Sequence, residues 1–566
     1  MSFAPQNQTP DVTDSLDGSL TTWYENVNNC LKTSECVPGH YEYAQAPSYG
    51  NQCPIQEGGS TKIDVACSRF EIVDINNSYI DCEFQFPLTI PPQIYADQTF
   101  VDDEGNIYYV GFKSSYDVID QYRVYSNGDL IYTQNHNNYE SFLNYISLTD
   151  SAKETSPCYA TSAKINRMDP NVPGVYINTT QSVAATIDVQ IKMKIPLNAF
   201  PILQNLKFYP GFMGRLSIEI YPSYKNLVWA ALSTSGLDVA KIAYCIPKAG
   251  TAIAAGGQNT VAVAAVPFNH VFLKAGRGCF SQINVEAANR QFLDDNNNDT
   301  LTAMPQTFLC NASTLTKFHL YLATYMIKMD VYNALEMNYL QIPLLFPIQT
   351  ISNTKFTSSM GSATHFTLQN TATLSHCDTM FVVFPTNSNE RTVSYNPEIR
   401  AQLNINSKYY PRESLSTNGF DERFTNLAYD ALNINNNPLM TPAEDVVASL
   451  RPFVRAMEID AAHNALYETY HISKGDKSNF FFAVPLSTDE DFMGGISSNG
   501  STVQIELVGD RDPADNSTIT AYPEAPVAIF LEDKLLKIYS MKPPGKPQIQ
   551  ITNATLDQIV ASGGQA

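Results

Sequence analysis

The sequence predicts an all-β protein made of two similar halves, and three observations support this fold class. Residues 187–197 alternate between apolar and polar side chains without a break, which is typical of a strand with one buried and one solvent-exposed face. A similar pattern returns about 287 positions later, within residues 484–507. Charged residues make up only 16% of the 566 residues while aromatic residues reach 11%, which favours strands joined by long, uncharged polar loops.

Four landmarks recur in the same order in both halves of the chain. They are the pairs Asn127 and Asn406, Glu140 and Glu422, Pro196 and Pro485, and Glu219 and Glu506. The two members of these pairs are 279, 282, 289 and 287 positions apart, respectively. Loops accept insertions at low cost, so this small drift is what loop insertions produce. The repeated order therefore indicates a tandem duplication rather than a short-period repeat.

The length of the chain predicts two or more domains, because single hydrophobic cores stop growing at about 250 to 300 residues. We divide the chain into an N-terminal arm, two β blocks and a C-terminal tail, at residues 1–60, 61–250, 251–542 and 543–566. The arm is polar, and we expect one amphipathic helix within it, over residues 19–31. The junction is placed near residue 250 because the strand pattern loosens between residues 235 and 310.

The first block is expected to contain regular strands, one hairpin and one short helix. Strands are predicted over residues 80–90, 187–197 and 216–221, and a helix over residues 139–146. Asn127-Gly128 separates two further β-rich segments, 121–125 and 130–133. Asn-Gly in this position predicts a hairpin with a type I′ turn, because both central residues of that turn adopt positive φ.

The second block repeats this outline. Strands are predicted over residues 381–384, 399–405, 527–531 and 535–539. A helix is predicted over residues 441–450, because Thr441 is a good N-cap and Glu444 follows it three residues later. The prolines within residues 543–547 are expected to end the last sheet.

The formal net charge of −21 argues against a surface that binds nucleic-acid phosphates directly, because such surfaces need Lys and Arg. Residues 1–7 lack the basic start and apolar core of a signal peptide, and no apolar run approaches the roughly 18 residues of a membrane span. We therefore expect a soluble protein made in the cytosol. Ten cysteines show no repeated spacing and are expected to be free thiols or small core residues. They are residues 30, 36, 53, 67, 82, 158, 245, 279, 310 and 377.

One tripeptide, His376-Cys377-Asp378, contains the residue types of a cysteine catalytic triad. Neighbouring residues of a strand point to opposite faces, so these side chains are expected to diverge. The other histidines form no HxH, HxxxH or HExxH spacing, which argues against a zinc site.

Three other kinds of segment carry candidate chemistry without the required pattern. Residues 294–299 are acidic, yet Asp299 and Pro305 stand where a calcium loop needs Gly and a bidentate Glu. The acids of residues 488–491 and 510–512 are those a glycosidase needs, but they follow strands, where exposed acids are common. Residues 274–278 lack the spacing of a phosphate-binding loop. We assign no catalytic, cofactor-binding or metal-binding residue and expect no cofactor, which favours a structural or binding protein over an enzyme.

Two blocks of roughly eight short strands, joined by long loops rich in Asn, Thr and Ser, fit two tandem eight-stranded jelly rolls with a few short helices. Ten short motifs carry a further resemblance. They are residues 111–113, 121–124, 127–128, 194–197, 209–212, 216–219, 381–384, 396–397, 402–406 and 410–411. In their order, from about residue 60 to 540, the chain resembles the double jelly-roll major capsid proteins of small DNA viruses, in particular virophages and Polinton-like viruses.

The resemblance implies a major capsid protein. Three chains would form a homotrimer whose six rolls make a pseudo-hexagonal capsomer, and capsomers would tile an icosahedral shell. The implied partners are neighbouring capsomers, penton proteins and minor or cement capsid proteins, with no sequence-specific nucleic-acid contact and no transmembrane segment. The implied location is the virion, after synthesis in the host cytoplasm. Residues 1–60 and the helix over 441–450 would then contact neighbouring subunits.

Two other classes stay open. A carbohydrate-binding β-sandwich protein, or a glycosidase with such domains, agrees with the aromatic content and the loop acids. That class is expected to carry clustered Trp on a sheet face, and the chain has 2 Trp. A single-roll capsid protein of the picornavirus type conflicts with the internal repeat and the length. Light scattering separates these classes, because a capsomer is a trimer.

Overall fold

The computed structural model describes the chain from residue 54 to residue 552, with gaps. The described residues are 54–56, 58–65, 71–90, 106–135, 137–179, 185–204, 206–223, 226–231, 251–255, 259–263, 281–282, 309–310, 313–326, 329, 332–333, 336–337, 344–358, 365–384, 398–405, 408–416, 422–432, 454–460, 465–471, 481–487, 495–498, 503–510, 525–539 and 548–552. The helices expected over residues 19–31 and 441–450 lie outside them.

Eight strands of the C-terminal half form two antiparallel sheets. In chain order they are β17 (Leu344–Lys355), β18 (His365–Ala372), β19 (Cys377–Val383), β20 (Glu398–Ile405), β21 (Lys408–Ser416), β24 (Phe482–Pro485), β25 (Val503–Asp510) and β26 (Val527–Tyr539). One sheet has the order β17-β26-β19-β24 and the other β18-β25-β20-β21. With the strands lettered B to I, these orders are B-I-D-G and C-H-E-F, which define a jelly roll of two Greek keys.

The N-terminal half has the same arrangement. Its eight equivalent strands are β1 (Ile55–Gln56), β2 (Thr61–Val65), β3 (Glu71–Ile90), β5 (Ile119–Ser126), β6 (Asp129–Gln134), β8 (Ala185–Pro196), β10 (Leu216–Pro222) and β16 (Thr314–Met326). Strand β16 pairs with β1 and β3, and β3 pairs with β8 on its other side, which gives B-I-D-G again. The second sheet, β2-β10-β5-β6, is C-H-E-F. We call the two halves the first roll and the second roll.

The predicted duplication is confirmed by equivalent elements. Pro196 and Pro485 are the last residues of the two G strands, and Glu219 and Glu506 lie in the two H strands. Asn127 and Gly128 join β5 to β6 with φ of 51° and 101°, as a type I′ turn requires. A helix follows strand F in each roll, α2 (Asn137–Ser147) in the first and α8 (Glu422–Ala431) in the second.

The boundaries drawn from the sequence need correction. Strand β1 lies inside the segment assigned to the arm, and β16 lies far beyond residue 250, yet the two strands pair with each other in the first roll. The loosened pattern near residue 250 is a long insertion between strands H and I of the first roll. We propose a division between Met326 and Leu344. The segment assigned to the tail contains β27 (Gln548–Thr552), which pairs with β26 because its residues alternate between polar and apolar.

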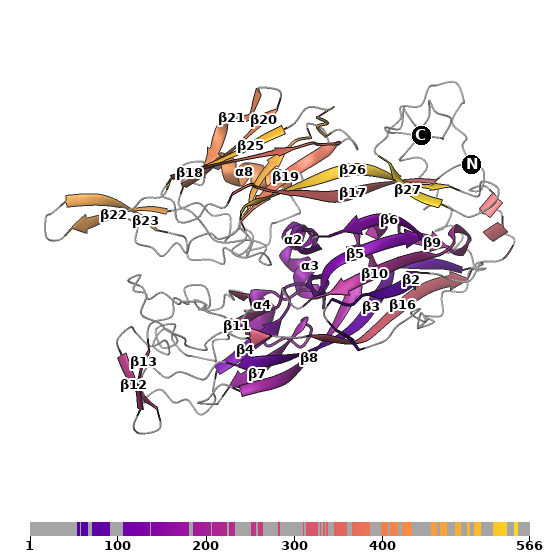
Figure 1. The fold of residues 1–566 in the computed structure, drawn as a ribbon, viewed down its shortest axis with the longest axis horizontal. Coiled ribbons are helices and arrows are strands. Elements are labelled where there is room, and N and C mark those ends of the chain that lie inside the picture. The colour runs from indigo at the N-terminus through magenta and orange to yellow at the C-terminus, as the bar shows by residue number, and fades with distance from the viewer. Residues whose placement is uncertain are drawn as a thin grey trace.

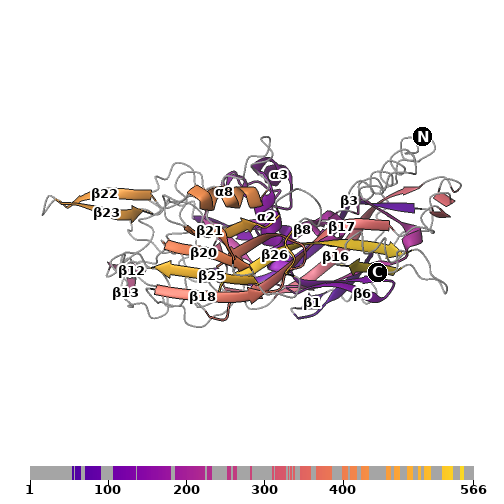
Figure 2. The same ribbon diagram turned by 90° about the horizontal axis from the view of Figure 1, so that it is seen from above.

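Long insertions gather at one end of the molecule. A third sheet has the order β14-β11-β4-β7, and two separate hairpins project nearby. These strands are β4 (Asn106–Gly111), β7 (Gly174–Thr179), β11 (Val228–Ala231), β12 (Thr251–Ala255), β13 (Asn259–Val263), β14 (Ser281–Gln282), β22 (Val454–Asp460) and β23 (Ala465–His471). They interrupt the D–E, F–G and H–I connections, which leave an antiparallel roll at the same end. In Figure 1 the labelled strands of this set lie in the left half, and Figure 2 shows the hairpins β12–β13 and β22–β23 at the left.

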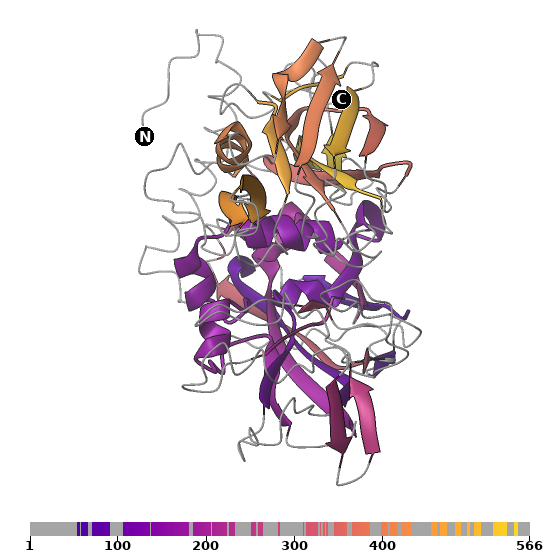
Figure 3. The same cartoon turned by 90° about the vertical axis from the view of Figure 1, so that its left-hand side faces the viewer.

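Two large apolar clusters form the interior, and each draws residues from both rolls. The cluster of the first roll includes Phe346, Ile348 and Leu536 of the second. The cluster of the second roll includes Phe142 and Tyr145 of α2, which belongs to the first. Helix α2 accordingly lies between the rolls (Figure 1), and Figure 3 shows purple helices of the first roll next to the orange and yellow strands of the second.

Candidate functional site

In the tripeptide His376-Cys377-Asp378, which was not assigned as a catalytic triad, the cysteine side chain lies in the protein core. Cys377 is the first residue of β19 and is fully buried, with its Sγ 3.6 Å from the carbonyl oxygen of Thr379. Burial raises the pKa of the Cys377 thiol far above its ordinary value. A nucleophilic cysteine needs a lowered thiol pKa, so the thiol has the character of a core residue. Cys82 and Cys158 are likewise buried free thiols.

Most of the acidic and glycine-rich segments weighed in the sequence lie outside the described residues. These are residues 274–278, 294–299, 488–491 and 511–512. Asp510 is described, at the end of β25, where it pairs with His365 on one side and Glu398 on the other. Within the part of the chain that the structure describes, no three His, Cys, Asp or Glu side chains form a metal site.

Among the described residues, Glu140 has the carboxyl group whose pKa is shifted furthest, and the sequence marked this residue only as a repeat landmark. Glu140 lies on α2 and is completely buried. Its Oε1 accepts hydrogen bonds from the phenols of Tyr116 (3.2 Å) and Tyr122 (3.0 Å), and its Oε2 accepts one from Gln134 Nε2 (3.0 Å). Burial raises the pKa of Glu140 to about 7, although the three hydrogen bonds oppose the shift. This carboxyl group therefore exchanges its proton near neutral pH.

Further buried charges surround α2. Asp117 accepts hydrogen bonds from Ser141 Oγ (2.5 Å) and from the backbone N–H of Ser114 (3.1 Å). The ammonium groups of Lys153 and Lys113 lie 3.9 Å and 5.8 Å from the centre of the Tyr145 ring. Buried charges are costly unless they find such partners, so this network makes the position of α2 specific. The sequence contains one indication of this network. Glu140 precedes Leu143 by three residues, so the acid and the leucine lie on the same, buried face of the helix.

The two rolls meet across α2 and β6. The ring of Phe142 lies 6.1 Å from that of Phe481, in an edge-to-face arrangement that joins the rolls. The phenol of Tyr132 in β6 lies beside the backbone of Ile351 in β17. The helix α5 (Pro201–Gln204) packs against the same strand. The junction is therefore apolar in its centre, with buried polar groups beside it.

Three solved viral structures are similar to this chain at low sequence identity. The mavirus major capsid protein is 12% identical over 91% of this chain and 90% of that chain, with a TM-score of 0.42. A Sputnik virophage structure gives 8% identity over 90% and 89%, with a TM-score of 0.41. The Faustovirus major capsid protein gives 8% identity over 93% and 97%, with a TM-score of 0.34. No family model and no curated protein matches the sequence.

The strand orders decide the fold by themselves. Both halves contain a B-I-D-G sheet and a C-H-E-F sheet. The chain is a double jelly-roll protein. In the described part of this double jelly-roll protein, no helix is long and apolar enough to cross a membrane.

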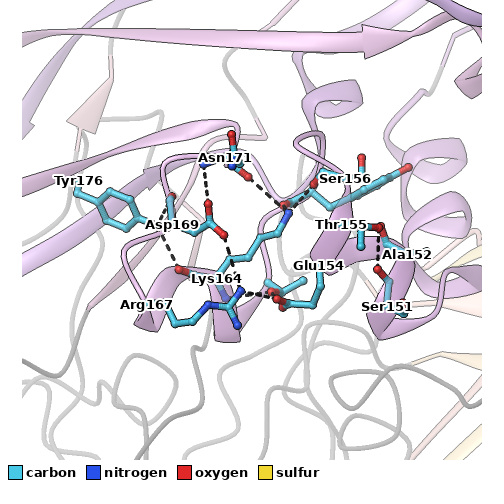
Figure 4. Close-up of polar contacts among 12 residues, drawn as sticks. Ser151, Ala152, Glu154, Thr155, Ser156, Lys164, Arg167, Asp169, Asn171 and Tyr176 are labelled. Atoms are coloured by element: carbon cyan, nitrogen blue, oxygen red, sulfur yellow. Dashed lines mark hydrogen bonds and ion pairs between the residues drawn. The ribbon is translucent and has the colours of Figure 1, made fainter.

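The F–G connection of the first roll is held by one buried cation (Figure 4). Lys164 lies on α4 (Ser162–Asn166), and its Nζ donates to the carbonyl oxygens of Ser156, Tyr159 (3.1 Å) and Asn171 (3.4 Å). Ser156 is the C-cap of α3 (Asp150–Thr155), where a cation complements the helix dipole. An ammonium group has three donor hydrogens, so all of them are used. The arrangement ties together a segment that has little apolar core of its own.

We expect Lys164→Met to lower the free energy of unfolding of the double jelly-roll protein by about 2 to 4 kcal/mol, because three carbonyl oxygens lose a buried charged donor. The matched control is Arg167→Met. Arg167 Nη2 lies 2.5 Å from Glu154 Oε2, but its side chain is 58% exposed. Surface ion pairs contribute less than about 1 kcal/mol, so this control is expected to change little. Urea unfolding followed by circular dichroism measures both variants, and equal losses would contradict the assigned role of Lys164.

Proposed function

We propose that this double jelly-roll protein is the major capsid protein of an icosahedral DNA virus, and that it has a structural rather than an enzymatic role. The observation that carries the proposal is the repetition of the B-I-D-G and C-H-E-F orders within one chain. This is the architecture that the resemblance of the sequence to double jelly-roll major capsid proteins implies. Three copies carry six similar rolls, which is the number that a pseudo-hexagonal capsomer needs.

The arrangement of the rolls supports the same proposal. The insertions of the D–E, F–G and H–I connections leave the rolls at one end, so upright rolls in a shell would present them on one surface (Figure 1). The sides of the rolls are then available for contacts between subunits. The proposed partners are two further copies in a trimer, neighbouring capsomers, penton proteins and minor or cement proteins. The proposed location is the virion, following synthesis in the host cytoplasm.

Size-exclusion chromatography with light scattering tests the proposal. The purified chain is expected to run as a homotrimer, and electron microscopy of the trimer is expected to show a pseudo-hexagonal outline. A glycan-binding sandwich protein or a glycosidase is the alternative from the sequence. A monomer that binds a glycan array would therefore refute the capsid proposal, whereas a trimer that binds none would support it.

A further inference from the structure

The contact between the two rolls within one chain provides a template for a contact between copies. On the first-roll side it is made by β6, the F strand, whose Ile131 and Tyr132 pack against the shared apolar cluster. On the second-roll side it is made by the B and I strands, β17 and β26, which contribute Phe346 and Leu536. The phenol of Tyr132 lies beside the backbone of Ile351, and Ile351 lies opposite Leu531 in the sheet.

Strand register identifies the residue of the second roll that is equivalent to Tyr132. The two E–F hairpins begin with the pairs Ser126 with Asp129 and Ile405 with Lys408. Two residues further back along strand E, Val124 pairs with Tyr132, and Leu403 pairs with Tyr410. Tyr410 therefore occupies the place of Tyr132.

Tyr410 differs from Tyr132 in exposure. The side chain of Tyr410 is 42% exposed and that of its neighbour Tyr409 is 49% exposed, whereas Tyr132 is half-buried in the junction. Within the described residues, only six large hydrophobic side chains are exposed, and two of them are these adjacent tyrosines. The F strand of the second roll thus carries aromatic groups without the cover that the first roll obtains from its partner roll.

The same register locates the surface that would receive them. The equivalence of Pro196 and Pro485 makes Ile80 equivalent to Met380, because these residues face Ile195 and Val484. Tyr79 is then equivalent to Thr379. In the first roll Tyr79 pairs with Tyr321, and in the second roll Thr379 pairs with Leu531. Tyr321 is therefore equivalent to Leu531, which lies next to the position where Tyr132 meets the second roll.

That surface has chemistry that suits a tyrosine. The rings of Tyr79 and Tyr321 are stacked with centres 5.1 Å apart, and the ammonium of Lys194 lies 4.7 Å from the centre of the Tyr79 ring. We call Tyr79, Tyr321 and Lys194 the aromatic patch. It lies on the polar face of the first B-I-D-G sheet, where both tyrosines are half-buried and Lys194 is exposed. In the second roll the equivalent strand β19 is buried on both faces over residues 379–383.

We propose that Tyr410 of one copy docks on the aromatic patch of a second copy, and so repeats between chains the contact that Tyr132 of β6 makes within a chain. The inference rests on the proposed capsomer and specifies how its subunits meet. The two surfaces are different, so the contact is head-to-tail, and such a contact closes into a ring when the rotation between copies allows it. The charged residues of the sheet face, including the Lys317–Asp81 pair at 2.6 Å, make the contact sensitive to salt.

A single variant with a matched control tests the contact. Tyr410→Ser is expected to weaken trimer association at least tenfold in analytical ultracentrifugation. The control is Leu130→Ser. Leu130 is 56% exposed and pairs with Tyr125 as Tyr409 pairs with Asn404, but its hairpin belongs to the roll already covered within the chain. The control is expected to associate within twofold of the unaltered protein.

Photo-crosslinking provides a second readout that does not depend on the stability of a variant. Benzoylphenylalanine placed at position 410 is expected to crosslink to peptides of β3, β8 or β16 of another copy, identified by mass spectrometry. Crosslinks only to other regions, or a Tyr410→Ser variant that associates as tightly as the control, would overturn the inference and leave the capsomer proposal standing. An unaltered protein that is monomeric would instead refute the capsomer proposal itself.

Discussion

Glu140→Gln is expected to flatten the pH dependence of stability between about pH 5 and pH 8. The folded pKa of Glu140 is raised from 4.5 to about 7, so the folded state holds a proton that the unfolded state releases. The associated stability is fully present below pH 4.5 and is lost as the pH rises through 7. At about 1.4 kcal/mol for each pKa unit, the unaltered protein is expected to lose about 3 kcal/mol over this window, and the variant much less.

The pKa of Glu140 is raised by burial within its own site. A second acid whose pKa is shifted in the opposite direction can therefore serve as a control for the sign of the pH dependence. The groups that face Glu140 are Tyr116, Tyr122 and Gln134, and none of them supplies a positive charge. Burial thus outweighs the hydrogen bonds.

Glu154→Gln is the control. Burial opposes the shift at Glu154, but hydrogen bonds from Thr161 and Arg167 hold the pKa of that carboxyl group below its usual value. Its stabilising contribution is therefore present above the unfolded pKa and is lost as the pH falls, which is the opposite sign. Urea denaturation at a series of pH values measures both variants. A steeper loss of stability with rising pH in Glu140→Gln would contradict the assignment.

Phe142→Ala is expected to lower the free energy of unfolding by about 3 to 5 kcal/mol and to separate the unfolding of the two rolls. Phe142 is 1% exposed, comes from a helix of the first roll and packs in the core of the second. Its removal leaves a cavity where the rolls are joined, and the surrounding structure relaxes only in part. Differential scanning calorimetry is expected to show one transition for the unaltered protein and two for the variant.

Phe84→Ala is the matched control for the junction. Phe84 is fully buried, and its ring contacts Phe86 and Phe112 of the same roll. The loss of stability should be similar, because the side chains are the same and both are buried. Calorimetry of Phe84→Ala should still show a single unfolding transition if the intact junction couples the unfolding of the two rolls. Two transitions in this control, or one in Phe142→Ala, would show that α2 is not the coupling element.

Local patterns in the sequence determined much of the architecture. The alternation over residues 187–197 became β8, and Asn127-Gly128 became the turn between β5 and β6. These features depend only on neighbouring residues, namely on which face of a strand is apolar and on which residues accept positive φ. The duplication was visible because equivalent strands kept their residues while the loops between them changed length.

Contacts between distant residues decided the rest. Strand β1 has only two residues and is defined by its pairing with Leu315 and Thr314, about 260 positions away, so no local period marks it. The end of the first roll was misplaced for the same reason, since β16 follows a long insertion. The proton affinity of Glu140 and the exposure of Tyr410 depend on what packs around each side chain. The sequence by itself thus determined two β rolls of one design, and only the tertiary structure decided where each begins and how they meet, because strand pairing and burial are set by residues far apart in the chain.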